Sequence, residues 1–142
     1  MSNIKIVTDS TMDISKELID EYNITVVPLS ITIDHHTYID GVDIEPDEFL
    51  SLMKISEELP KSSQPPTGKF LDVYKQLSKD GSAIISIHMT EALSGTIHSA
   101  HGAAQMSDAD VTVVDSSFIS KALGFQVVEA AKMAKNGFNK EE

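Results

Sequence analysis

Ser94, Gly95 and Thr96 are the residues whose types and spacing are best suited to chemistry in this chain. They follow the apolar run Ala83–Ile87, which is typical of a buried parallel strand, and precede apolar residues at helical spacing from Ile97 on. This pattern predicts a strand, a tight turn and a helix that begins near Ser94. A helix start presents unpaired N–H groups and a partial positive charge, and Gly95 leaves that backbone accessible. We therefore expect a binding site for a carboxylate or phosphate, with the hydroxyls of Ser94 and Thr96 as additional donors.

Polar side chains also follow two other predicted strands. The segment Asp9–Thr11 comes after Ile4–Val7, and Asp115–Ser117 comes after Asp110–Val114. Ligands of α/β sheets bind beyond the carboxyl ends of the strands, so these ends are expected to meet at one site. Residues Lys61–Thr67 are expected to form a loop, and its part Ser63–Thr67 is expected to overhang the same edge. The residues predicted to lie at the edge of the site are Asp9, Ser10, Ser63, Asp115 and Ser116.

The elements that position these residues alternate between strand and helix patterns. Helices are expected over Ile14–Tyr22, from Pro46, from Thr67, after Gly95 and over Ser120–Lys135, with a β-prone run at Ile24–Ile33 and a return strand at Thr37–Ile39. This order predicts an α/β domain with a parallel sheet, helices on both faces and a β-hairpin excursion. A chain of 142 residues fits one domain.

Each of these signals also has a purely structural interpretation. Ser94 and Thr67 stand where a hydroxyl residue commonly caps a helix, which contributes ~1 kcal/mol of stability. Asp9 and Asp115 are of the type that closes turns through the side chain. The adjacent histidines His35 and His36 would point to opposite faces of an extended segment, so no metal site is expected there. The chain contains neither a phosphate-loop motif nor the G-x-S-x-G motif of hydrolases.

The composition narrows the classes of partner. The net charge of −11 argues against binding to nucleic acid, and no apolar run reaches the ~18 residues of a membrane span. We therefore expect neither a nucleic-acid partner nor stable membrane insertion. The chain has no cysteine, which excludes thiolate chemistry and fits a cytoplasmic location.

Five short motifs follow one another along the chain. They are Val7-Thr8-Asp9-Ser10-Thr11, Tyr38-Ile39-Asp40-Gly41-Val42-Asp43, Ser63-Gln64-Pro65-Pro66-Thr67, Leu93-Ser94-Gly95-Thr96 and Val114-Asp115-Ser116. Together, and in this order, they resemble the DegV family of bacterial fatty-acid-binding proteins, which includes the carrier subunits of fatty acid kinases. The motifs span essentially the whole chain, which makes the resemblance specific.

The resemblance implies the N-terminal lobe of a two-lobed fold that buries a long-chain fatty acid in an apolar tunnel. The hydroxyls that hold the carboxylate in the family fall here on Thr67 and Ser94, and the backbone of Gly95 and Thr96 is expected to assist them. The candidates for the wall around the acyl tail are Ile31, Ile33, Met89 and Ile97, with Phe118 and Ile119 further out. In members that serve a kinase, a separate ATP-using subunit phosphorylates the carboxylate. The carrier is then not an enzyme and needs no cofactor other than its fatty acid.

Three interpretations remain open from the sequence. In the first, residues 1–142 are an N-terminal lipid-binding domain, and the C-terminal lobe of the family is absent from this chain. In the second, the chain is a small-molecule phosphotransfer or hydrolytic enzyme that uses Asp9, Asp115 and the Ser94 loop. In the third, the lone lobe binds no ligand and associates through an exposed apolar face.

Overall fold

Four parallel strands form the central sheet of the computed structural model, which describes residues 3–142. Their order across the sheet is β2 (Thr25–Val27), β1 (Ile4–Asp9), β6 (Ala83–His88) and β7 (Val111–Asp115). The inner strands β1 and β6 are almost continuously buried, as expected for a parallel sheet that is covered on both faces. The register pairs His88 with Asp115, so the carboxyl ends of β6 and β7 reach the same edge.

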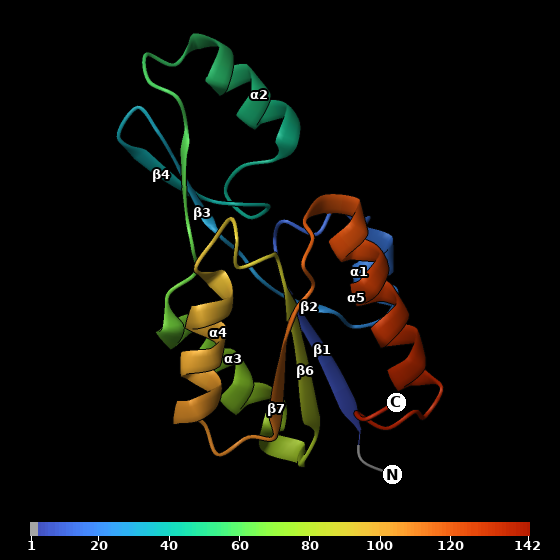
Figure 1. Cartoon of the computed structure of the whole chain (residues 1–142). Coiled ribbons are helices and arrows are strands. Elements are labelled where there is room, and N and C mark those ends of the chain that lie inside the picture. Colours follow the sequence, from blue (N-terminus) through green and yellow to red (C-terminus); the bar gives the residue numbers. More distant parts are fainter. Residues whose placement is uncertain (1–2) are drawn as a thin grey trace.

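Helices cover both faces of this sheet (Figure 1). On one face lie α3 (Thr67–Leu77) and α4 (Thr96–Met106), and on the other lie α1 (Lys16–Glu21) and α5 (Ser120–Lys135). The core beneath α3 and α4 contains Val7, Val27, Phe70, Tyr74, Ile84, Ala100 and Ala103. The core beneath α5 is larger and is built around Ile6, Ile87, Leu123, Val127 and Val128. The predicted α/β class with helices on both faces is confirmed.

A second, smaller sheet is antiparallel and stands beyond the carboxyl ends of the central strands (Figure 1). It consists of β4 (His36–Ile39), β3 (Ser30–Ile33) and β5 (Lys61–Ser63), in that order. The helix α2 (Pro46–Ile55) accompanies this sheet and has no buried residue. The predicted β-hairpin excursion is therefore the core of a small unit that projects over the edge of the central sheet.

The structure corrects the sequence prediction at two places in this unit. The β-prone run Ile24–Ile33 is not one strand, because Pro28 lacks a backbone N–H and separates β2 in the central sheet from β3 in the small sheet. The stretch that starts at Lys61 was expected to be a loop, but residues 61–63 pair with β3. Three polar residues do not carry a recognisable strand pattern.

Two helix starts also differ from the prediction. The first helix is shorter than Ile14–Tyr22, and Ser15 caps it by accepting a hydrogen bond from Leu18 N at 3.4 Å. Asp13 does not cap this helix, because its carboxylate accepts a hydrogen bond from Ser120 Oγ. Thr67 is the first residue of α3 and makes no capping hydrogen bond, since Pro66 holds the cap position. Within residues 3–142, no helix is long and apolar enough to cross a membrane.

Candidate functional site: a pocket between the two sheets

A pocket of about 380 Å³ lies at the seam between the two sheets, beyond the carboxyl end of β6. Residues from the turn after β6 and from the start of α4 form one wall: Met89, Leu93, Ser94 and Gly95. Residues from the small sheet and its flanks form the other: Leu29, Ser62, Ser63 and Gln64. The pocket therefore combines serine hydroxyls with apolar side chains at the edge where α/β sheets bind ligands.

Ser94 is held in place by the residue two positions further on. Its Oγ accepts a hydrogen bond from Thr96 N at 3.2 Å and lies 2.9 Å from Thr96 Oγ1. Thr96, which was predicted to contact the ligand, is fully buried and does not line the pocket. When the Thr96 hydroxyl donates to Ser94, the Ser94 hydroxyl hydrogen is free to point to an acceptor in the pocket. Thr96 thus holds the Ser94 side chain in position through its backbone N–H and its hydroxyl.

Gly95 lines the pocket, and it also leaves room for the Gln64 side chain. Gly95 has an ordinary φ of −77°, so the backbone conformation does not require glycine. A Cβ atom at this position would overlap the Oε1 atom of Gln64 and lie 3.0 Å from its Cδ and Nε2 atoms. The backbone of Gly95 is therefore covered by the Gln64 carboxamide and is not open to a ligand from that direction.

The predicted carboxylate ligand Thr67 lies outside the pocket. Its side chain faces α4, where its Cγ2 atom is 3.4 Å from the position that a Cβ on Gly102 would take. The residues with hydroxyl side chains that line the pocket from the small sheet are Ser62 and Ser63. Ser63 was expected at the edge of the site, whereas Ser62 was not considered.

The candidates for the tail wall are dispersed. Met89 lines the pocket, while Ile33 and Ile97 are buried and do not. Ile31 is half-buried on β3 and also lies outside the pocket lining. Phe118 and Ile119 are on the surface, with 53% and 40% of their area exposed. Of the six residues, the structure brings only Met89 to the pocket.

The other predicted edge residues build turns around the strand ends. Ser10 Oγ accepts a hydrogen bond from Leu29 N at 3.0 Å and so joins the end of β1 to the start of the small sheet. Asp115 accepts from the backbone N–H groups of Glu91 and Ser117. Ser116 Oγ bonds both the N–H and the carbonyl of Phe118. These contacts fit the turn-forming interpretation, and none of these side chains lines the pocket.

Asp9 belongs to a buried polar network directly beneath this edge. Its Oδ2 atom lies 3.0 Å from His88 Nδ1, and His88 Nε2 lies 2.6 Å from Ser86 Oγ. Tyr74 donates to Ser86 Oγ at 2.8 Å. Asp9, Ser86 and His88 thus have the order of a Ser-His-Asp triad, but all three are fully buried, so no substrate reaches the serine. The network joins β1, β6 and α3.

Hydrogen bonding controls the charge state of this network. Burial raises the pKa of Asp9, but hydrogen bonds from His88, Thr11 and Met89 outweigh burial and leave the pKa below its ordinary value. Burial raises the pKa of Tyr74 to about 12, so its hydroxyl stays protonated and donates to Ser86. Asp9 is therefore a buried carboxylate whose acceptor positions are filled from four donors.

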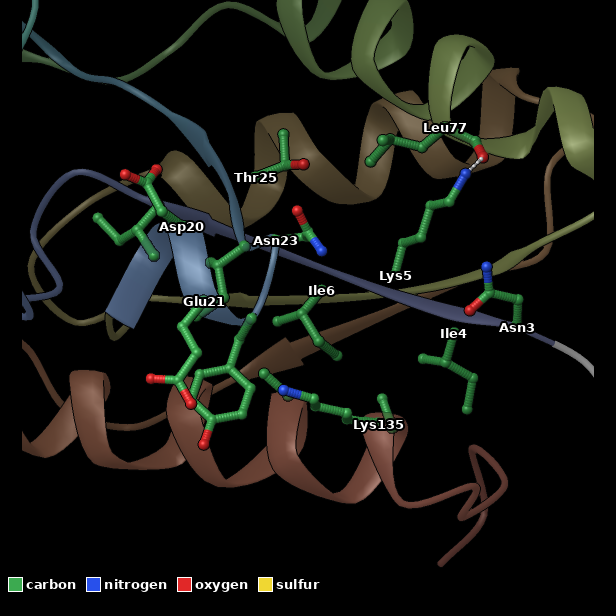
Figure 2. Close-up of a pocket in the computed structure, with 15 residues that line it drawn as sticks. Asn3, Ile4, Lys5, Ile6, Asp20, Glu21, Asn23, Thr25, Leu77 and Lys135 are labelled. Carbon is green, nitrogen blue, oxygen red and sulfur yellow. Dashed lines mark hydrogen bonds between the residues drawn. The ribbon is translucent and has the colours of Figure 1, made fainter. Parts of the chain in front are cut away.

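A larger pocket of about 740 Å³ lies at the opposite end of the central sheet (Figure 2). It is bounded by the start of β1, the end of α1 and the end of α5. Its cations are already engaged: Lys5 Nζ donates to Leu77 O and to Asp80, each at 2.7 Å, and Lys135 Nζ lies 5.1 Å from the centre of the Tyr22 ring. The pocket also lies at the amino ends of the strands, away from the usual ligand edge of an α/β sheet. The smaller pocket is therefore the candidate functional site.

Comparison with known proteins places this geometry in a family. A family model described as an uncharacterised protein of the DegV family matches residues 3–142. The chain belongs to the DegV family. A DegV domain-containing protein of Streptococcus pneumoniae is 54% identical over 137 residues, which are 96% of this chain and 49% of that protein. A Staphylococcus aureus relative is 48% identical over the same length. The chain thus spans about half the length of these DegV relatives.

Solved DegV structures share the fold. DegV from Bacillus subtilis, described as a fatty-acid-binding protein, superposes with a TM-score of 0.94 at 37% identity and covers 99% of this chain and 51% of that one. A stearic-acid-binding protein from Eubacterium ventriosum superposes with a TM-score of 0.89 at 31% identity, with 99% of this chain and 50% of that chain covered. The DegV fold predicted from the five motifs is confirmed.

Four pocket residues were missed at the sequence level: Leu29, Ser62, Gln64 and Leu93. Ser62 and Gln64 flank Ser63 in a stretch that was interpreted as a loop, and the strand pairing that aims them is visible only in the structure. Gln64 belongs to the DegV motif Ser-Gln-Pro-Pro-Thr, and this motif could have identified it as a candidate site residue. Within residues 3–142, no group of three histidine or acidic side chains gathers as a metal site.

Proposed function

We propose that this chain binds a long-chain fatty acid, with its carboxylate in the pocket between the two sheets. Ser94 donates from one wall, and one serine of the Ser62–Ser63 pair donates from the other, since neighbouring side chains of a strand point to opposite faces. The observation that carries this proposal is the Ser94 hydroxyl, which Thr96 holds in position and which lies in the same pocket lining as Ser62 and Ser63. DegV proteins of more than 30% identity that share this fold are described as fatty-acid-binding.

The chemistry of the pocket suits an amphipathic anion. A buried carboxylate is costly unless hydrogen bonds meet it, and the Ser94 hydroxyl together with a serine hydroxyl of β5 would supply such bonds. The side chains of Leu29, Met89 and Leu93 offer apolar contact next to these donors. Each methylene that the ligand buries contributes ~0.8 kcal/mol, so a long tail outweighs the cost of desolvating the head group. The pocket lining contains no lysine, so the hydroxyls alone meet the negative charge from this lobe.

In the cell, the bound acid would be presented to a separate kinase subunit that forms the acyl phosphate. The chain itself then acts as a carrier, without a cofactor, in the reducing cytoplasm that its lack of cysteine fits. The alternative phosphotransfer or hydrolytic role for Asp9 finds no support in the geometry, because this carboxylate is fully buried and bonded to His88, Thr11 and Met89.

Lipid extraction followed by mass spectrometry tests the carrier function. The chain is reloaded with oleate, and bound lipid is compared for the wild type, Ser94→Ala and Ser62→Ala/Ser63→Ala, with B. subtilis DegV as the positive control. We expect both variants to lose at least about 10-fold in affinity, since each removes hydrogen bonds to a charged group. The exposed serine Ser51 on α2 supplies the matched control, Ser51→Ala.

The variant Thr67→Ala separates the two possible head-group sites. Loss of oleate in Thr67→Ala, with full binding in Ser62→Ala/Ser63→Ala, would move the carboxylate to the start of α3 and contradict the proposed pocket. No oleate bound to the wild type after reloading would contradict the carrier function of this lobe. Hydrolysis or phosphotransfer assays would then test the alternative.

A further inference from the structure

We propose that Gln64 is a latch that holds the small sheet against the start of α4 and so sets the width of the pocket. This inference extends the proposed function, because the latch positions Ser62 and Ser63 opposite Ser94. Gln64 itself is a positioning residue in this role. Its carboxamide spans the seam between the two sheets.

The small sheet has few attachments to the rest of the molecule. Within residues 3–142, two hydrogen bonds join the segment 29–64 to the remainder of the chain. One runs from Leu29 N to Ser10 Oγ at 3.0 Å, and the other runs from Gln64 Nε2 to Ser99 Oγ at 3.1 Å. Both Leu29 and Gln64 line the pocket. Both residues that hydrogen-bond the small sheet to the rest of the chain therefore also line the proposed ligand pocket.

The fit of Gln64 against α4 depends on a glycine. The carboxamide lies against Gly95, where any side chain would overlap it, and then reaches Ser99, which lies one turn further along α4. Ser99 is buried, and its own N–H bonds the carbonyl of Gly95 at 3.1 Å. The amide group of Gln64 thus covers the first turn of α4, directly beside Ser94.

The backbone of Gln64 is prepared for this contact. Pro65 follows it, is fully buried and restricts the residue before it to an extended conformation. Strand β5 ends at Ser63, so the latch follows directly after the two serines. Because Gln64 directly follows the two serines in the chain, a displacement of Gln64 should also displace Ser62 and Ser63.

This arrangement predicts that Gln64 and Gly95 act as one unit. The variant Gln64→Ala removes the latch, and Gly95→Ala displaces it, because the far end of a glutamine side chain moves more easily than the helix backbone. The double variant should therefore be no more perturbed than either single variant. Two independent effects would add instead.

Spin labels test the latch without any ligand. The chain contains no cysteine, so Glu48→Cys on α2 and Gln105→Cys on α4 give one labelled pair across the seam. Electron–electron double resonance then measures the distance distribution between α2 and α4. We expect a broader distribution in Gln64→Ala, in Gly95→Ala and, to the same extent, in the double variant. The matched controls are Gln76→Ala on the exposed side of α3 and Gly102→Ala, whose added Cβ meets only Thr67 at 3.4 Å.

Oleate affinity provides the second measurement. A lost neutral hydrogen bond that positions the binding hydroxyls should weaken binding by about 3- to 10-fold in Gln64→Ala. A distance distribution identical to that of the wild type in Gln64→Ala, or additive effects in the double variant, would overturn the latch. A broadened distribution with unchanged affinity would overturn its role in setting the pocket. Absence of oleate binding in the wild type would count against the proposed function, while the distance measurement would still decide the latch.

Discussion

Two polar clusters lie near the same edge of the central sheet. They differ in burial and in how many of their hydrogen-bonding groups already have partners. The buried cluster comprises Asp9, His88, Ser86 and Tyr74, which have no exposed surface and all have hydrogen-bond partners. The pocket cluster comprises Ser62, Ser63 and Ser94, all of them partly or fully exposed. Within residues 3–142, Ser62 and Ser63 make no side-chain hydrogen bond to another residue.

This difference shows how to distinguish the two roles. A polar group whose donors and acceptors are already filled stabilises the fold and has nothing left to offer a ligand. A hydroxyl that is held in place by its neighbours but keeps one free hydrogen can bind an anion. The contrast leads to four predictions, in which the effect on stability falls from the first to the last and the effect on binding is confined to the last.

The largest effect is expected from Asp9→Ala. This change removes the partner of His88 and leaves the N–H groups of Thr11 and Met89 without their acceptor inside the fold. We expect the free energy of unfolding to fall by about 3–5 kcal/mol, as for other buried pairs that lose one partner. Urea denaturation measures this, with the exposed Asp72→Ala as the control. A loss below 1 kcal/mol would show that the network does not support the fold.

The stability contributed by Asp9 should depend on pH in a defined direction. Its pKa in the folded protein lies below the ordinary value of 3.8, because hydrogen bonds from His88, Thr11 and Met89 outweigh the effect of burial. The carboxylate therefore stabilises the fold fully above about pH 4, and this contribution is lost as pH falls through the folded pKa. The difference in unfolding free energy between the wild type and Asp9→Asn should be constant from pH 7 to 5 and shrink below pH 4.

A second acid has to be accounted for in this experiment. The hydrogen bond from Lys5 lowers the pKa of Asp80, which lies at the opposite end of the sheet and is exposed. Asp80 also contributes to acid sensitivity, so the Asp9 comparison is repeated in an Asp80→Asn background. A difference between wild type and Asp9→Asn that stays unchanged down to pH 3 would contradict the lowered pKa of Asp9.

The sequence predicted the central sheet better than the small one, and the reason is physical. Apolar runs such as Ala83–Ile87 identify buried strands because burial is a property of consecutive residues. The polar strand Lys61–Ser63 carries no such pattern, since its pairing with β3 depends on a distant partner. The buried position of His88 was equally hard to predict, because its residue type favours the surface and one of its two hydrogen-bond partners, Asp9, lies 79 positions earlier in the chain.

The lining of the proposed head-group pocket was predictable in part. Ser94 was identified from the strand–turn–helix pattern, which is local. Thr67 was chosen from the same motif that contains Ser63 and Gln64, but a motif does not reveal which of its side chains turn toward the pocket. Ser63, at the start of this motif, belongs to strand β5, whereas Thr67 already belongs to α3 and packs toward Gly102.

A smaller effect on stability is expected from Tyr74→Phe. The change removes the donor to Ser86 Oγ but keeps the ring and its packing against Phe70. Ser86 retains its hydrogen bond with His88, so no buried group is left without a partner. We expect a loss of about 1 kcal/mol in urea denaturation and unchanged oleate affinity. A loss of affinity in this variant would show that the buried cluster communicates with the pocket.

The smallest effect on stability is expected from Ser62→Ala/Ser63→Ala, the variant that should weaken oleate binding most. Both side chains are exposed, and their strand pairing uses only the backbone, so the free energy of unfolding should change by less than about 0.5 kcal/mol. Denaturation without ligand and oleate titration are measured on the same preparation. A variant that loses both stability and affinity would place these serines with Asp9 among the residues that support the fold. Loss of affinity alone would identify them as ligand-binding groups. Side chains that make no hydrogen bond within the fold can be removed with little change in the free energy of unfolding.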